Sequence, residues 1–292
     1  MVKNPVQRVA AIHDLSGFGR ASLTVVIPVL SSMGFKVCPI PTAVLSTHSQ
    51  FKNYRFVDLT DHIPGIMQHW KELSLTFDAI YSGFLGSARQ IDMMVEFINE
   101  FKNGDETLVM VDPVLGDNGK LYGPFDNEMV EEMRKLVQKA DIITPNITEV
   151  GLLLEDNPTL ITNTKDTIKA IDKLTAMGPE IVVVTSVPDE EGRTAVVAYN
   201  RNDGRYWKVP VDYLPAAFPG TGDTFASVLL GSILQGDNLP MSLDRATHFI
   251  SHGVRSTFGF DYDEKEGILL EKVLPTLKTP VQLSSYEVLK KE

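Results

Sequence analysis

The sequence predicts a three-layer α/β/α protein, in which a central, mostly parallel sheet lies between two layers of helices and ends in an antiparallel edge. Short apolar runs rich in β-branched residues alternate with longer helical patterns over roughly the first two thirds of the chain. Several of these runs are apolar on both faces, which is typical of parallel strands buried on both sides. After Thr185 the alternation gives way to two strand-like segments around an Asp-Gly turn, the signal of a hairpin.

The alternating region supplies six strands and six helices. Strands separated by a helix are expected to run parallel, because the helix carries the chain back to the same end of the sheet. Pro28 lies within the first helical pattern and indicates a kink or a start there. The predicted strands are 8–12, 35–40, 77–82, 107–112, 141–145 and 180–186. The predicted helices are about 19–33, 61–74, 88–102, 126–139, 147–154 and 164–176.

The rest of the chain is predicted to begin with a hairpin and to return to helices. The segments "TAVVAYN" (194–200) and "RYWKVPV" (205–211) flank "RNDG" and form the expected antiparallel pair at one sheet edge, before helices at about 222–235 and 242–257. The last residues, "SSYEVLKKE", are polar enough either to fray or to pack on a partner. No repeat, low-complexity linker or break in composition divides the chain, so residues 1–292 are expected to form one domain.

Charge and cysteine content exclude several classes of protein. The net charge of −11 argues against a broad basic face, so we expect no nucleic-acid partner and no membrane partner, and an anionic ligand must be bound by backbone amides or a metal. The single cysteine, Cys38, cannot form an internal disulfide and lies in an apolar run, which favours a core position and a reducing cytoplasm. We expect neither a signal peptide nor a transmembrane helix, because no long apolar stretch occurs.

Several familiar site motifs are absent or incomplete. There is no P-loop of the form G-x-x-x-x-G-K-[ST] and no G-x-S-x-G elbow. "GFGRAS" after the first strand approaches G-x-G-x-x-G, but no acid ends the second strand, so a dinucleotide site is not expected. His248 and His252 lie four residues apart on a predicted helix without an evident third ligand, which favours surface positions over a metal site.

Polar and glycine-rich segments occur where the predicted parallel strands end. Ligands of open parallel sheets gather at the carboxyl ends of the strands, so the shared position of these segments predicts one binding site on that rim. The segments are "HDLSGFG" (13–19), "TAVLSTHS" (42–49), "SGFLG" (82–86), "DPVLGDNGKLYG" (112–123), "PNITE" (145–149) and "TSV" (185–187), together with 218–223.

The segment "PGTGDTF" carries the strongest single indication of chemistry. Gly220 and Gly222 permit positive φ and leave space for a close ligand, and a helix begins directly after them. Unpaired N–H groups and the helix dipole make such a start a place for a phosphate or a transferring phosphoryl group. Asp223 stands beside it, where its carboxylate either accepts a proton from an attacking hydroxyl or caps the helix. Both interpretations remain open at this point.

A second acidic group is expected near the same rim. Asn146 and Glu149 are three residues apart at a predicted helix start, an arrangement that suits either hydrated Mg²⁺ or a simple cap. Asp112 and Asp117 in "DPVLGD" offer further carboxylates for metal or phosphate charge, or serve as strand-end and turn residues. The glycine-rich "GDNGKLYG" has the composition of a mobile flap, with Tyr122 or Lys120 closing over a ligand.

The segments "GTGDTFAS", "DPVLGD", "ITPNITE" and "VVVTS" resemble the ribokinase-like superfamily in its vitamin B6 kinase branch, which comprises the pyridoxal, pyridoxine and pyridoxamine kinases. The similarity runs from about residue 9 to 257. It implies a ribokinase-like fold and transfer of the γ-phosphoryl group of ATP to the 5′-hydroxymethyl group of a pyridine. It also implies Mg²⁺, often a monovalent cation such as K⁺, and usually a homodimer.

The resemblance assigns roles to individual residues, with Asp223 in the position of the catalytic base. Phe84 is then expected against the pyridine ring, with His48 near the ring substituents. The matched anion hole is Gly220, Thr221 and Gly222. The matched nucleotide contacts are Asp112, Asp117, Thr144, Asn146, Thr185 and Ser186, and the matched metal positions are Asp112, Asn146 and Glu149. The matched vitamer contacts are Asp14, Ser16, Ala43, His48, Ser49, Phe84 and Tyr122, the last on the flap.

Three hypotheses about function follow. The first is a B6 kinase that produces pyridoxal 5′-phosphate or a related phosphate. The second is a hydroxymethylpyrimidine (phosphate) kinase of thiamine synthesis, because these enzymes share much of the pattern and the "D-x-S-G-x-G" of the first loop resembles theirs. The third is a noncatalytic carrier or sensor of pyridoxal phosphate. The joint presence of Asp223, Asn146 and Glu149 argues against the third, because a protein without phosphoryl transfer has no physical need for that trio.

Overall fold

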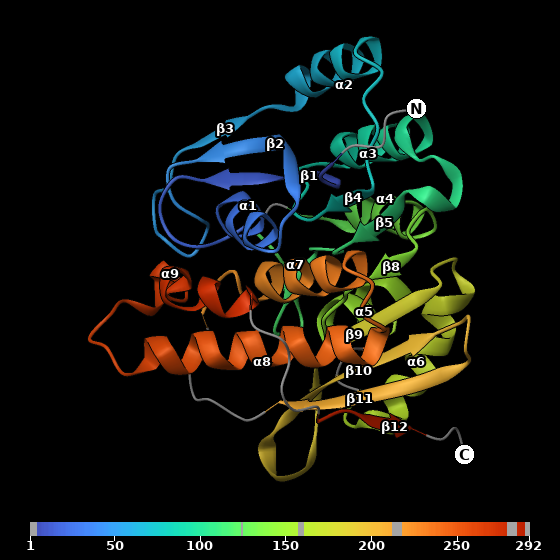
Figure 1. Ribbon diagram of the computed structural model, residues 1–292, viewed down its shortest axis with the longest axis vertical. Helices are drawn as coiled ribbons and strands as arrows, with labels where there is room; N and C mark the ends of the chain where they lie inside the picture. Colours follow the sequence, from blue (N-terminus) through green and yellow to red (C-terminus); the bar gives the residue numbers. More distant parts are fainter. Residues whose placement is uncertain (1–4, 124, 157–160, 212–217, 279–284, 290–292) are drawn as a thin grey trace.

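The computed structural model describes residues 5–123, 125–156, 161–211, 218–278 and 285–289 (Figure 1). A ten-stranded sheet runs through these residues and carries strands from both ends of the chain. Its strands are β1 (Arg8–Ser16), β2 (Lys36–Leu45), β3 (Phe56–Asp58), β4 (Ala79–Ser82), β5 (Leu108–Val111), β8 (Ile142–Ile143), β9 (Ile181–Pro188), β10 (Thr194–Asn200), β11 (Arg205–Val211) and β12 (Glu287–Leu289).

The order of the strands confirms the predicted sheet. Across it the order is β12-β11-β10-β9-β8-β5-β4-β1-β2-β3. The neighbours from β2 through β1, β4, β5 and β8 to β9 pair in parallel. The hairpin of β10 and β11 pairs antiparallel with itself and with β9, as the Asp-Gly turn indicates. The carboxyl ends of six parallel strands therefore lie along one rim.

Helices cover both faces of the sheet and form two separate cores (Figure 1). One face is covered by α1 (Leu23–Ser32), α7 (Thr221–Leu234), α8 (Leu239–Phe258) and α9 (Leu270–Val273). The other is covered by α2 (Ile63–Glu72), α3 (Ala88–Phe101), α4 (Asn127–Val137), α5 (Ile147–Leu154) and α6 (Thr164–Ala176). Short 3-10 helices lie at Thr60–His62, Gly104–Glu106, Glu190–Gly192, Glu264–Glu266 and Leu274–Lys278.

The apolar runs of the central strands explain the two cores. In β1, Val9 and Ala11 face the core beneath α1, α7 and α8, whereas Ala10 and Ile12 face the core beneath α2–α6. Successive side chains of a strand point to opposite faces, so a strand covered on both sides must be apolar at every position. The prediction of a three-layer α/β/α arrangement is confirmed by this alternation.

Two helices begin three or more residues away from the start that the hydrophobic pattern predicts. Helix α1 begins at Leu23 and not at 19, because Ser22 has a φ of 51° and pairs with Leu15 in an isolated β-bridge. Pro28 lies inside this helix. Helix α8 begins at Leu239, three residues before the predicted start, because the side chain of Asn238 accepts the N–H of Met241 as a helix cap.

Two edge strands were not predicted. Strand β3 has three exposed residues and pairs with β2, which places it beyond the parallel part of the sheet. Strand β12 contains part of the polar C-terminal segment and pairs antiparallel with β11. The expectation that this segment frays or packs on a partner is therefore wrong for Glu287–Leu289, which pack on the chain's own sheet. Within the described residues, no helix combines the length and the apolar character needed to span a membrane.

Candidate active site

The start of helix α7 is the centre of the candidate site. Gly220 is its N-cap residue with a φ of 74°, and a Cβ at this position would lie 2.0 Å from the carbonyl oxygen of Arg20. Only glycine therefore allows the chain to make this turn against the loop that follows β1. Gly222 is exposed, and a Cβ there would meet no atom within 4 Å. The start of the helix is thus tightly packed on one side and open on the other.

The backbone amides of this turn are available to a ligand. The helix has no side-chain cap, and the hydroxyl of Thr221 donates to the carbonyl oxygen of Phe218 at 3.0 Å. Within the described ranges, the N–H groups of Gly222 and Asp223 donate no hydrogen bond. Unpaired N–H groups at a helix start, together with the helix dipole, attract a negatively charged group. The assignment of Gly220, Thr221 and Gly222 as an anion hole stays a prediction, and the open start of the helix is compatible with it.

Asp223 does not cap its own helix. Its Oδ2 accepts the N–H of Ser22 at 2.8 Å, across 201 residues of sequence, and its side chain is 15% exposed. Ser22 holds this orientation with a positive φ that is rare outside glycine, as residues at functional sites often do. Burial raises the pKa of Asp223 to about 7, the N–H of Ser22 lowers this pKa, and the charge of Asp14 raises it further. A carboxylate with a pKa near neutrality suits a general base.

Asp112 and Glu149 form a buried acidic pair next to Asp223. Burial and the charge of Asp223 raise the pKa of Asp112 to about 7. Burial and the charge of Asp112 raise the pKa of Glu149 well above its usual value. The repulsion among these carboxylates would be relieved by a cation.

Glu149 is held in place by backbone and by Asn146. Its two carboxylate oxygens accept the N–H groups of Asn146 (2.8 Å) and Leu115 (3.2 Å). In return, Asn146 accepts the N–H of Glu149 at 3.0 Å, so the two residues form a capping box at the start of α5. The amide of Asn146 also donates to the carbonyl oxygen of Gly116 at 2.9 Å. The prediction that Asn146 and Glu149 share one helix start is confirmed, and each side chain is turned toward the backbone of the other residue.

The donor set of this region fits Mg²⁺ in a limited way. Within the described residues, no three His, Cys, Asp or Glu side chains converge on a point that could hold a metal ion. Carboxylate oxygens are nevertheless the ligands that Mg²⁺ prefers, and Mg²⁺ is usually bound by one or two carboxylates together with water and substrate phosphates. Asp112 and Glu149 supply two such carboxylates, of which Glu149 already accepts backbone N–H groups at both oxygens, and the side-chain oxygen of Asn146 is engaged in the capping box.

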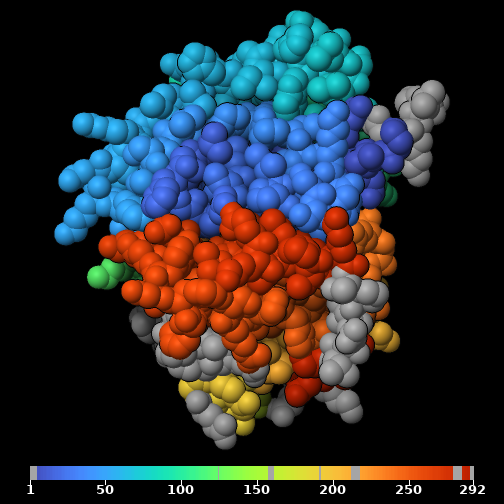
Figure 2. Space-filling model, turned by 60° about the vertical axis from the view of Figure 1, so that its left-hand side comes forward, coloured from blue at the N-terminus to red at the C-terminus, as the bar shows by residue number. Residues whose placement is uncertain are grey.

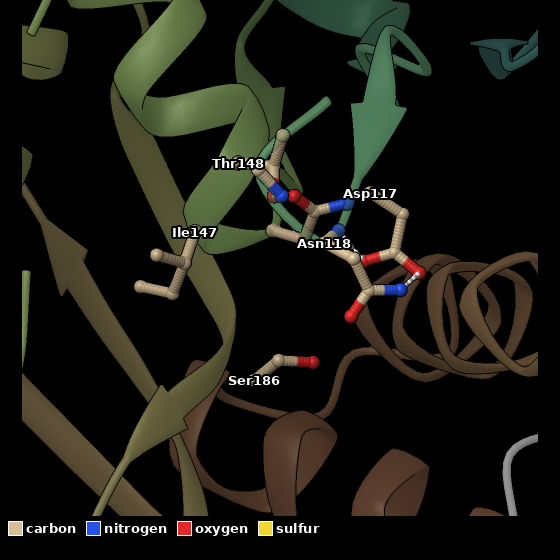
Figure 3. A pocket seen from close by; sticks show the side chains of 7 residues that line it. Asp117, Asn118, Ile147, Thr148 and Ser186 are labelled. Atoms are coloured by element: carbon tan, nitrogen blue, oxygen red, sulfur yellow. Dashed lines mark hydrogen bonds between the residues drawn. The ribbon is translucent and has the colours of Figure 1, made fainter. Parts of the chain in front are cut away.

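A pocket of about 300 Å³ opens beside α5 (Figure 3). One wall is the small hairpin of β6 (Gly116–Asp117) and β7 (Lys120–Leu121), and the opposite walls are the start of α5 and the end of β9. It contains three predicted nucleotide contacts, and the sequence analysis missed the other four lining residues, although the "DNG" turn was a usable signal. The lining residues are Asp117, Asn118, Gly119, Asn146, Ile147, Thr148 and Ser186.

The predicted flap is this hairpin and the residues after it. The N–H of Gly119 donates to the hydroxyl of Thr148 at 2.8 Å, which ties the turn to α5. Tyr122 follows the hairpin and is 39% exposed. Partial burial raises the pKa of its hydroxyl, and the charges of Glu149 and Asp117 raise it further, which places the phenol beside the acidic group. Of the remaining nucleotide positions, Thr144 directly follows β8 and is buried, and Thr185 lies within β9.

The predicted vitamer positions lie in several environments. Asp14 is buried, accepts the hydroxyl of Ser16 at 3.1 Å and has a pKa raised by burial. Its charge acts on Asp223, so the two carboxylates lie near each other. Ala43 is buried in β2, whereas Ser49 is exposed. Phe84 stacks on Phe125 with the ring centres 5.6 Å apart.

His48 has a more structural position than the sequence suggests. Its Nε2 donates to the carbonyl oxygen of Lys265 at 2.5 Å, and its ring lies 4.9 Å from that of Phe51. In the same region the backbone N–H of Arg20 donates to the carbonyl oxygen of Glu266 at 2.9 Å. Figure 2 shows that residues from the beginning of the chain lie directly against the C-terminal segment on one face. In this structure His48 thus joins the loop after β2 to the segment before α9.

The most informative residues that sequence reasoning missed are Ser22 and His13. Ser22 holds Asp223 through its backbone N–H, which no side-chain pattern reveals. His13 is fully buried within β1, with its Nδ1 3.9 Å from Oδ1 of Asp223. The only signal for His13 was its place in the first rim segment.

Comparison with known proteins identifies the family of this chain. Residues 65–267 match the model of the phosphomethylpyrimidine kinase family. The chain belongs to this family. A Bacteroides thetaiotaomicron protein named as a phosphomethylpyrimidine kinase is 56% identical, with a TM-score of 0.96 over 99% of this chain and 100% of its own. A second crystal form of it, with a TM-score of 0.94, is described as the form with pyridoxal.

Pyridoxal kinases are also among the relatives of this family member. The structure of pyridoxal kinase from Lactobacillus plantarum has 30% identity and a TM-score of 0.85, and the match covers 93% of this chain and 96% of that one. The pyridoxal kinase of Arabidopsis thaliana is 30% identical over 244 residues, which are 80% of this chain and 75% of its own. The ribokinase-like fold implied by the sequence resemblance is therefore confirmed.

Proposed function

We propose that this protein is a pyridoxal kinase, which transfers the γ-phosphoryl group of ATP to the 5′-hydroxymethyl group of pyridoxal, pyridoxine or pyridoxamine. The observation that carries the proposal is the start of α7, where open backbone amides adjoin a carboxylate whose pKa lies near neutrality. The pyridoxal kinases among the relatives, and the 56% identical relative described with pyridoxal, support a B6 vitamer as the substrate.

The geometry supports a simple sequence of events. Asp223 accepts the proton of the substrate hydroxyl as the alcohol oxygen bonds to the γ-phosphorus, and the bond from this phosphorus to the bridging oxygen of ADP breaks. The N–H groups of Gly222 and Asp223 then face the charge of the transferring group. Phosphoryl transfer depends mainly on positioning and electrostatics, which an acidic protein can supply through amides.

Asp112 and Glu149 would hold the Mg²⁺ that neutralises phosphate charge when ATP is bound. The pocket between the β6–β7 hairpin and α5 would hold the nucleotide, with Asp117, Asn146 and Ser186 in its wall. Asp14 would meet the vitamer near Asp223, since the charge of Asp14 acts on the catalytic carboxylate. The hairpin and Tyr122 would close over the phosphates.

The proposal extends to the state of the protein in the cell. We infer one kinase domain over residues 1–292, because the ten-stranded sheet takes strands from both ends of the chain. A homodimer is supported by exposed apolar side chains at the β2–β3 edge, where Phe56 is 46% and Val57 56% exposed. The single cysteine supports a cytoplasmic location, and the kinase resemblance supports use of a monovalent cation such as K⁺.

The test is a parallel substrate panel with purified protein, ATP and Mg²⁺. ADP formation is measured with pyridoxal, pyridoxine, pyridoxamine and hydroxymethylpyrimidine, and the phosphorylated product is identified by mass spectrometry. We expect turnover on at least one pyridine. Turnover on the pyrimidine alone would replace the proposal with the thiamine-pathway kinase, and binding of pyridoxal phosphate without turnover on any alcohol would favour a carrier.

A further inference from the structure

We propose that His13 is a positioning residue for Asp223: it directs its Nδ1–H at Oδ1 of the carboxylate and so fixes the plane in which this group meets the substrate alcohol. The inference rests on the proposed kinase function for its catalytic consequence. Its structural part, a contact between an imidazole N–H and a carboxylate, stands on contacts that are independent of any substrate.

The two ring nitrogens of His13 have no other partner. The side chain is fully buried, and neither Nδ1 nor Nε2 forms a hydrogen bond within the part of the chain that the structure describes. An unsatisfied buried polar group costs about 1–3 kcal/mol, so a buried imidazole that only fills space would be a poor choice for this position. The acceptor that the structure places before Nδ1 is Oδ1 of Asp223, at 3.9 Å.

The distance of 3.9 Å is about 1 Å longer than a hydrogen bond. Hydrogen bonds of catalytic groups are often long in ligand-free enzymes and shorten when the substrate complex forms. A rotation of the carboxylate, or one bridging water, closes the gap without displacement of the backbone. The contact is thus expected to tighten in the complex with substrate.

The surroundings of His13 hold the ring in one orientation. The ring of Tyr81 lies against it edge-on, with the ring centres 4.4 Å apart and an interplanar angle of 76°. On another side is Gly83, where a Cβ would lie 2.2 Å from Nδ1 and 2.3 Å from Cε1. Glycine therefore leaves the space that the imidazole occupies. Tyr81 and Gly83 both accommodate this side chain, which indicates that the structure fixes the position of the imidazole ring.

The contact acts on the carboxylate without adding charge. Burial lowers the pKa of His13 to about 3, so the ring is neutral near pH 7 and carries one N–H. The adjacent carboxylate favours the tautomer with this proton on Nδ1. Ser22 holds only Oδ2 of Asp223, which leaves the carboxylate free to rotate about its bond to Cβ. A second donor at Oδ1 removes that freedom and favours one approach of the substrate hydroxyl.

The kinetic test uses two variants of nearly the same shape, His13→Asn and His13→Leu. The amide nitrogen of Asn takes the place of Nδ1, whereas Leu has no donor. We expect His13→Leu to lower kcat for pyridoxal about 10- to 100-fold with KM values for pyridoxal and ATP within about twofold, and His13→Asn to recover most of the loss. Equal kcat values for the two variants, at similar melting temperatures, would overturn the proposal.

A spectroscopic test keeps the proposal decidable if His13→Leu does not fold. The tautomer of His13 is read from its ring ¹⁵N shifts in the folded wild-type protein, and the signal is assigned by its loss in His13→Asn. We expect Nδ1 protonated and Nε2 unprotonated at pH 7.5. The opposite tautomer would contradict the inference. If the wild-type protein turned over none of the B6 vitamers, the kinase proposal would be rejected. The tautomer would then still show whether the Nδ1–H of His13 faces the carboxylate of Asp223.

Discussion

Helices α5 and α7 both begin at the candidate site with an acid at their third position, yet their starts are opposite in character. In α5, Asn146 and Glu149 bond to each other's backbone N–H groups, so the first turn is closed. In α7 the cap is Gly220, which has no side chain, and Asp223 reaches away to Ser22. The first turn of α7 therefore remains open to a ligand.

The difference between the two helix starts depends on one residue, the cap. An asparagine cap bonds to the third N–H and draws the acid back, which stabilises the helix by about 0.5–2 kcal/mol. A glycine cap contributes no such bond and leaves N–H groups unpaired. The α5 start thus suits a structural role beside the nucleotide pocket, and the α7 start suits charge stabilisation in a reaction. Substitutions at the start of α7 are therefore expected to affect the reaction, and substitutions at the start of α5 are expected to affect mainly stability.

The largest effect is expected from Asp223→Asn. The amide oxygen can still accept the N–H of Ser22, so the fold should persist, but the side chain no longer accepts a proton. We expect kcat for pyridoxal to fall about 10²- to 10⁴-fold, the usual contribution of a general base. Steady-state phosphorylation assays measure the rate, and calorimetric titration with an ATP analogue measures nucleotide affinity, which should stay within about threefold. A rate close to wild type would remove Asp223 as the base.

The next effect separates the two glycines of α7. Gly220→Ala introduces a Cβ 2.0 Å from the carbonyl oxygen of Arg20 at a φ of 74°, and we expect the free energy of unfolding to fall by about 2–4 kcal/mol. Gly222→Ala meets no atom within 4 Å and should leave this free energy within about 1 kcal/mol of wild type. Urea unfolding measures both. Equal losses in the two variants would show that the close approach at Gly220 is absent in solution.

The raised pKa of Asp223 predicts a pH-dependent cost in stability. The folded-state value is about 7, above the unfolded value of about 3.9, so the folded protein binds more protons between these limits. The protonated Asp223 side chain therefore contributes fully to the stability of the fold below a pH of about 4, and this contribution is lost as the pH rises through about 7. We expect Asp223→Asn to be more stable than wild type by about 1–3 kcal/mol at pH 8, with a difference that shrinks toward pH 5.

This pH dependence is measured by urea unfolding at several pH values, and it has a counterpart in activity. The wild-type kcat/KM should fall as the pH is lowered below about 7, because the base becomes protonated. If the free energies of unfolding of wild type and Asp223→Asn differ by the same amount at every pH, Asp223 is not a buried acid with a raised pKa.

The two helix starts also show what the sequence could predict. The capping box of α5 involves residues three apart, and the sequence analysis placed both the helix and the pair correctly. The open start of α7 was predicted from its glycines, but not the orientation of Asp223, because its partner Ser22 is 201 residues away and contributes only a backbone N–H. Such contacts arise when the sheet brings the first loop to α7. Local periodicity likewise missed β3 and β12, short edge strands that depend on the neighbouring strand.

The smallest effect separates the two bonds of Asn146. Asn146→Ala removes both the cap and the contact with Gly116, and we expect the free energy of unfolding to fall by about 1–2 kcal/mol. Asn146→Ser keeps a capping oxygen but cannot reach the carbonyl of Gly116, so most of this stability should return. If the contact with Gly116 also positions the β6–β7 hairpin over the nucleotide, Asn146→Ser should still raise KM for ATP severalfold. A wild-type KM in Asn146→Ser would confine Asn146 to capping, and the closed start of α5 would then contribute to the site only by holding Glu149 in place.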